Sequence, residues 1–99
     1  MSVDTGKLTL LQRKLASNAL ETCPPNVSKF AIVAKDNGNS LKYEVQARPP
    51  FVLNDEAEAT LKEIFILYES GGDPLRGFTC EFTEKPDETW GMVMEYDYP

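Results

Sequence analysis

Residues 78–98 alternate between apolar and polar side chains on both sides of a short polar break. Alternation at period two places one set of side chains on each face of a β-strand, so the pattern predicts two strands. The break, residues 84–89, contains Pro86, which cannot donate to a strand ladder and suits a loop. These residues therefore predict a hairpin. Its alternating apolar residues are Phe78, Cys80 and Phe82 before the break and Trp90, Met92, Met94, Tyr96 and Tyr98 after it.

Residues 8–20 are predicted to form a first helix, because apolar residues recur there at spacings of three and four. Asp4 or Thr5 can cap its start. The helix is expected to end at Cys23-Pro24-Pro25, because a residue before proline avoids the α region and proline cannot continue the ladder. The predicted buried face consists of Leu8, Leu11, Leu15 and Ala19.

Residues 27–34 and 41–47 are predicted to form another hairpin. The first run is apolar on both faces, which indicates either a strand covered on both sides or an inner strand of the sheet. The second run alternates, with Leu41 and Tyr43 on its core side. Asn37-Gly38 between the runs is typical of a type I′ turn, which needs positive φ at both central residues.

A second helix is predicted to begin at Asn54 or Asp55. If Asp55 is the N-cap, Glu58 three residues later completes a capping box. Gly71-Gly72 is expected to end the helix, because a left-handed residue is favoured there. The predicted buried stripe consists of Ala57, Leu61, Ile64, Phe65 and Tyr68.

The predicted element order is α-β-β-α-β-β in a single domain over residues 1–99. Two hairpins and two amphipathic helices predict a two-layer α+β fold, an antiparallel four-stranded sheet with the helices on one face. The helix-containing connection between the hairpins permits several pairings, so the sequence leaves the strand order open.

The net charge of −6 is unevenly distributed. Residues 55–99 contain twelve Asp and Glu and three Lys and Arg, whereas residues 1–54 contain four and seven. Such a chain should attract basic proteins and repel nucleic acid, although solubility alone is a competing explanation. The chain has neither a long apolar run nor a signal-peptide pattern, so we expect a cytoplasmic protein without a membrane partner.

The residues needed for common catalytic and metal sites are missing from the sequence. There is no histidine, no Cys-x-x-Cys, no glycine-rich phosphate loop and no serine elbow. Cys23 and Cys80 are most simply two reduced thiols. The prediction is therefore no enzyme, no cofactor and no metal, although paired carboxylates such as Glu95 and Asp97 could in principle share acid–base work.

The order of these elements resembles the YezG-like immunity proteins of bacterial toxin systems. The resemblance rests on the first helix, LLQRKLASNAL, the strand VSKFAIVAK, the second helix EATLKEIFILYESGG, and the acidic and aromatic ending Tyr96-Asp97-Tyr98. It covers most of the chain. It implies a protein that binds and neutralises a cognate toxin, with a secreted nuclease as the expected toxin.

An immunity protein of this kind needs a surface for its toxin. Nucleases are usually basic because they bind phosphates, so an acidic partner gains steered association, and buried Trp and Tyr commonly supply the affinity. The predicted contact residues are Asp73, Asp87, Glu88, Trp90, Glu95, Tyr96, Asp97 and Tyr98. A core position is the competing interpretation for Trp90, Tyr96 and Tyr98, because they share a strand face with Met92 and Met94.

An acidic secretion chaperone is the alternative function. Small acidic α+β chaperones that hold an effector before export are similar at the level of sequence pattern. A chaperone is expected to be a dimer that binds an unstructured segment, whereas an immunity protein binds one folded toxin domain and suppresses its activity. The sequence leaves the oligomeric state open.

Overall fold

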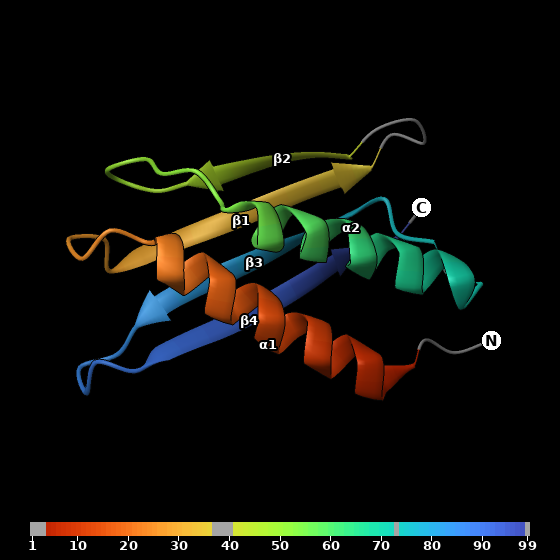
Figure 1. Cartoon of the computed structure of the whole chain (residues 1–99), viewed down its shortest axis with the longest axis horizontal. Helices are drawn as coiled ribbons and strands as arrows, with labels where there is room; N and C mark the ends of the chain where they lie inside the picture. Colours follow the sequence, from red (N-terminus) through yellow and green to blue (C-terminus); the bar gives the residue numbers. More distant parts are fainter. Residues whose placement is uncertain (1–3, 37–40, 73, 99) are drawn as a thin grey trace.

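A computed structural model describes residues 4–36, 41–72 and 74–98 of the chain. It confirms the predicted α+β fold and the order α-β-β-α-β-β. Figure 1 shows both helices on the same face of the sheet, running in opposite directions. The elements are α1 (Thr5–Thr22), β1 (Lys29–Asp36), β2 (Leu41–Gln46), α2 (Asp55–Ser70), β3 (Gly77–Glu84) and β4 (Trp90–Asp97).

The sheet has the strand order β2-β1-β3-β4, and each neighbouring pair is antiparallel. β1 and β3 are the inner strands, while β2 and β4 form the two edges. β1 is therefore an inner strand, which was one of the two predicted alternatives. The other alternative, burial of both faces, is wrong: Ala31 and Val33 stay partly exposed because both helices pack on the opposite face.

The core lies between the sheet and the helices. Phe82 on β3 stacks on Phe30 of β1, with 4.5 Å between ring centroids and 12° between ring planes. Phe65 of α2 packs on Phe78 of β3 at 5.0 Å. The predicted apolar stripe of α2 is confirmed, because all five of its residues are buried. The predicted face of α1 is confirmed in part. Leu15 and Ala19 are buried, whereas Leu8 and Leu11 remain partly exposed.

The helix ends follow capping chemistry. Asp4 caps α1, because its Oδ1 accepts hydrogen bonds from the N–H groups of Gly6 (3.0 Å) and Lys7 (3.1 Å). The helix ends at Thr22, directly before Cys23 and the two prolines. Both observations confirm the sequence prediction.

The capping box predicted for Asp55 and Glu58 is wrong. Asn54 is the N-cap of α2, and its Oδ1 accepts from the N–H of Ala57 at 2.8 Å. The third helical residue is then Ala57, which has no carboxylate to complete the box. At the other end Gly72 has a φ of 78°, the left-handed conformation that was expected of the glycine pair. The turn predicted at Asn37-Gly38 lies outside the described residues.

Alkaline pH is expected to destabilise the domain through Cys80. Burial raises the pKa of this thiol from 9.0 to about 12, and both cysteines are free. Because the unfolded chain releases this proton first, the stability contributed by the neutral thiol is present below pH 9.0 and is lost as pH rises toward 12. The free energy of unfolding should fall by up to about 1.4 kcal/mol per pH unit in that window.

Urea unfolding of the wild type and of Cys80→Ala at several pH values measures this effect. The variant is less stable at neutral pH but should lose stability less steeply above pH 9.0. Parallel pH profiles for the two proteins would show that Cys80 has no part in the alkaline loss.

Candidate protein-binding site

The two faces of β4 have different roles. Its even-numbered side chains point toward the helices and pack, partly buried, against the core. Its odd-numbered side chains lie on the sheet face that neither helix covers, which we call the open face. The core-side residues are Trp90, Met92, Met94 and Tyr96, and the open-face residues with side chains are Val93, Glu95 and Asp97.

Trp90 and Tyr96 help to hold the hairpin on the core. The ring of Trp90 lies 5.7 Å from that of Phe30. Tyr96 is 5.2 Å from the ring of Tyr68, and its hydroxyl accepts a 2.7 Å hydrogen bond from Nε2 of Gln12 on α1. Burial is also the main cause of the raised pKa of Tyr96. Both predicted contact residues therefore have packing roles, as the competing core interpretation held.

Tyr98 lies just beyond β4 and is 46 % exposed. Its ring contacts Tyr68 edge-on, at a centroid distance of 6.3 Å. It belongs to the helix side of the sheet, and about half of its surface remains accessible to a partner.

Three carboxylates of β3 and β4 lie on the open face, and with one valine they form what we call the acidic patch. Val93 lies directly opposite Glu81 and is 59 % exposed. Glu95 and Asp97 follow on the next two rows. Within the described residues no ion pair neutralises these carboxylates. The acidic patch consists of Glu81, Val93, Glu95 and Asp97.

A hollow of about 300 Å³ adjoins the acidic patch. Gly77 forms part of its floor, and a Cβ atom there would lie only 2.6 Å from the carbonyl oxygen of Ala34. Glu95 and Asp97 line the hollow together with Lys35. Glycine at position 77 thus lets β1 approach β3 closely at this end of the sheet, and two carboxylates lie beside this close approach.

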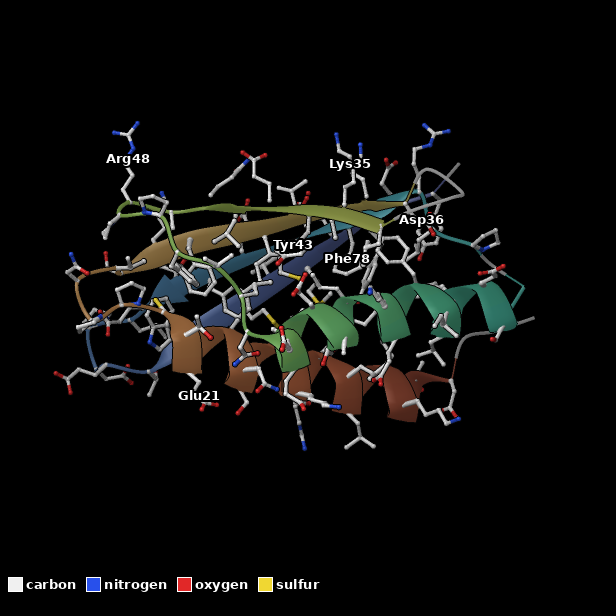
Figure 2. The ribbon with its side chains drawn as sticks, turned by 45° about the horizontal axis from the view of Figure 1, so that its top comes forward. Glu21, Lys35, Asp36, Tyr43, Arg48 and Phe78 are labelled. Carbon is white, nitrogen blue, oxygen red and sulfur yellow. The ribbon has the colours of Figure 1, made fainter. Side chains whose placement is uncertain are left out.

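The other half of the open face is mainly basic. Figure 2 shows Lys35 and Arg48 pointing away from the helices, whereas Tyr43 and Phe78 point toward them. A shallow hollow of about 790 Å³ lies between the ends of these strands, with Glu44 and Glu81 also on its border. The open face is therefore acidic on β3 and β4 and richer in cations on β1 and β2. The cations are Lys29, Lys35, Lys42 and Arg48.

Asp87 and Glu88 shape the turn between β3 and β4. Oδ1 of Asp87 accepts hydrogen bonds from the hydroxyl (2.6 Å) and the N–H (3.1 Å) of Thr89, which lower the pKa of Asp87. Glu88 has a φ of 69°, the left-handed conformation of the turn. The length of β4, roughly 25 Å for a strand of this size, separates this turn from Asp97.

The structure thus divides the predicted contact residues among three places. Glu95 and Asp97 lie together on the open face. The aromatic residues lie on the helix side, and the turn residues Asp87 and Glu88 lie at the far end of β4. Asp73 is outside the described residues. Glu81 and Val93 were not among the predicted contact residues. Alternation places each of them on a strand face, but only the β3–β4 register brings the two side by side.

The described part of the chain contains no group of three or more His, Cys, Asp or Glu placed to hold a metal ion. The three carboxylates of the acidic patch lie on separate rows of the sheet, opposite Val93, Thr79 and Gly77. This spacing suits contacts with an extended partner surface.

Comparisons with protein-family models and with curated protein sequences found no match to this chain. The resemblance to YezG-like immunity proteins therefore stays a prediction. None of the helices in the described ranges is long and apolar enough to cross a membrane.

Proposed function

We propose that this domain binds a basic protein through the acidic patch, and that it acts in the cytoplasm as an immunity protein which neutralises a nuclease toxin. The observation that carries the proposal is the open face itself. Three carboxylates without ion-pair partners among the described residues lie on this face of the β3–β4 hairpin together with an exposed valine.

The composition of the open face supports a binding role. One face of an antiparallel sheet can face water, and then its residues are usually polar. Here Val93 is well exposed, and Ala31 in the same cross-strand row and Val33 in the next row are partly exposed. Apolar groups within a charged surround are common where proteins bind one another.

The electrostatics favour a basic partner. The chain has a net charge of −6, and three of its open-face acids, Glu81, Glu95 and Asp97, lie on the two strands nearest the β4 edge. Opposite charge on a partner would speed association. A lysine or arginine of the partner would enter the hollow that Glu95 and Asp97 line, where these carboxylates would pair with its charge.

A nuclease toxin suits this surface for a chemical reason. Its nucleic-acid site must be basic in order to bind phosphates. A carboxylate-rich patch seated on that site would take the place of the phosphates and exclude the substrate. The resemblance to immunity proteins supports the same conclusion.

Replacing Asp97 with lysine is expected to weaken partner binding about tenfold or more, because the change removes an attraction and adds a repulsion. Stability should change by no more than about 0.5 kcal/mol, because the side chain is exposed. The main-chain carbonyl of Asp97, which accepts from the N–H of Arg76 at 2.8 Å, is unaffected by the substitution.

The matched control is Glu63→Lys, which makes the same charge change at an exposed position of α2. Binding by calorimetry and unfolding by urea are measured on both variants. Equal weakening by both would assign the effect to net charge, and a parallel loss of stability in Asp97→Lys would make that residue structural.

Association with the basic partner should slow as salt rises from about 0.05 to about 0.5 M, because ions screen exposed charges beyond a few ångströms at high ionic strength. The dissociation rate should change much less, because it depends mainly on short-range contacts. Stopped-flow mixing at several salt concentrations measures both rates. A salt-independent association rate would contradict electrostatic steering.

Affinity capture from lysate of the native cells tests the function itself, with the wild type and Asp97→Lys as paired baits. The proposal expects a basic nuclease domain that the wild type retains and inhibits and that the variant retains poorly. A captured partner held through an unstructured segment, with the bait behaving as a dimer, would instead support the secretion chaperone.

A further inference from the structure

The outer edge of β4 is a long strand edge with no partner in the described chain. β4 pairs with β3 over eight residues in continuous register, and it is the last strand of the sheet. The N–H of Lys85 donates to the carbonyl of Thr89 at 2.7 Å, so Lys85 and Thr89 form a hydrogen-bonded pair. Hydrogen-bonded pairs alternate along an antiparallel ladder, and the main-chain groups of the odd-numbered residues of β4 therefore bond to β3. The outward N–H and C=O groups therefore belong to Trp90, Met92, Met94 and Tyr96.

This edge lacks several of the features that commonly prevent strand addition. Proteins commonly protect edges with lysine, proline, bulges or short strands. β4 has no lysine, arginine or proline between Trp90 and Asp97, and its pairing with β3 is unbulged. β2, the opposite edge, is shorter, carries Lys42 and is followed by Pro49 and Pro50.

The side chains at this edge are incompletely covered. The core-side residues of the neighbouring strand β3, Phe78, Cys80 and Phe82, are at most 2 % exposed. Those of β4 keep an intermediate exposure although α1 crosses in front of the strand in Figure 1. An additional strand beside β4 would cover them with its own apolar side chains.

We propose that β4 binds an extended segment of the basic partner as a fifth, antiparallel strand, in which apolar residues alternate with lysine or arginine. The apolar residues of this segment lie opposite Met92 and Met94 on the helix side. Its basic residues lie on the open face beside Glu95 and Asp97. This inference rests on the proposed function and specifies how the acidic patch recognises its partner.

Charge complementarity selects this occupant. An antiparallel neighbour places its residues directly opposite those of β4 on the same face, within reach of charge pairing. Glu95 and Asp97 supply two negative charges at one end of the edge. At the other end Lys85 lies against Gly91, its Cε 3.2 Å from the position a Cβ would take. The basic residues of the segment therefore belong at the Glu95–Asp97 end.

The probe is an octapeptide that alternates lysine and valine. It is made in two N-methylated forms, one methylated at the valines and the other at the lysines. In the proposed register the valines lie opposite the even-numbered residues of β4, so their backbone groups make the bonds to β4. N-methylation of the valines removes those donors, whereas N-methylation of the lysines removes donors on the far edge only. The valine-methylated form should bind at least about tenfold more weakly than the lysine-methylated form.

Amide hydrogen exchange by NMR locates the contact on the full chain. Binding of the unmethylated peptide should slow exchange at Met92 and Met94, whose N–H groups point outward. The amides of Val93 and Glu95, already bonded to β3, should change little. Equal affinity of the two methylated peptides, or unchanged exchange at Met92 and Met94, would overturn the strand addition.

Charge-reversal variants separate this inference from the proposed function. Glu95→Lys is compared with Glu44→Lys, which lies on the same open face and in the same cross-strand row at the β2 edge. Suppose that the two methylated peptides bind the wild type equally, and that Glu95→Lys but not Glu44→Lys weakens the binding of both. The acidic patch then binds basic partners, but strand addition is wrong. If methylation matters and Glu95→Lys does not, strand addition stands and acidic recognition fails. Absence of any peptide binding overturns the inference. The proposed function is then tested independently by the affinity capture from lysate.

Discussion

Replacing Phe82 with alanine is expected to lower the free energy of unfolding by about 3–5 kcal/mol. Phe82 is 1 % exposed, lies on an inner strand within the core, and stacks on Phe30. Its loss removes apolar burial and leaves a cavity that the paired strands cannot close. Domains of this size have about 5–15 kcal/mol in total, so much of the stability should disappear.

Urea unfolding followed by circular dichroism measures this change. Val93→Ala is the control, since it removes apolar atoms from a strand side chain that is 59 % exposed, and should stay within about 0.5 kcal/mol of the wild type. Similar losses in the two variants would mean that the core is not centred on the Phe30–Phe82 stack.

Replacing Gly77 with alanine is expected to cost about 1–3 kcal/mol. The new Cβ would lie 2.6 Å from the carbonyl oxygen of Ala34. Both atoms are fixed by the backbone, so no rotamer change can separate them. The β1–β3 pairing around Lys35 and Gly77 must shift, and with it the end of β4 that carries Asp97.

Gly91→Ala makes the same chemical change on the other strand of the hairpin. There the nearest atom is the Cε of Lys85 at 3.2 Å, the far end of a flexible side chain that can move. This variant should be neutral or slightly stabilising, because glycine weakens a strand through its conformational freedom. Thermal unfolding of both variants measures the difference, and Gly77→Ala is expected to have the lower melting temperature. Equal melting temperatures would contradict the close approach at Gly77.

Much of the fold follows from the sequence because local signals agree with one another. The stripe that includes Leu61 and Ile64 predicted the buried face of α2, and Asp4 predicted the start of α1. The capping box failed because two capping residues stood side by side. Asn54 and Asp55 are equally suitable by type, and the position that the incoming chain gives Asn54 decided between them.

The candidate site was predicted less completely. Alternation placed Glu95 and Asp97 on one face of the strand and Trp90 and Tyr96 on the other. The structure agrees, because the two aromatic residues pack against the core and the two acids are exposed. Glu81 was missed because it belongs to another strand. Its place opposite Val93 depends on the register between β3 and β4. That register is a property of the pair of strands, and the residue pattern of one strand alone does not reveal it.

The sequence by itself determined the helices, the strands, their inward faces and the acidic character of the C-terminal half, because these depend on periodicity, capping and charge within short segments. Only the tertiary structure decided the order β2-β1-β3-β4. That order makes β4 an edge and brings Glu81 beside Val93, while the packing of both helices on one side leaves the other sheet face open. The physical reason is that strand neighbours are chosen by packing of the whole core, in which the pairing of β1 with β3 buries Phe30 against Phe82.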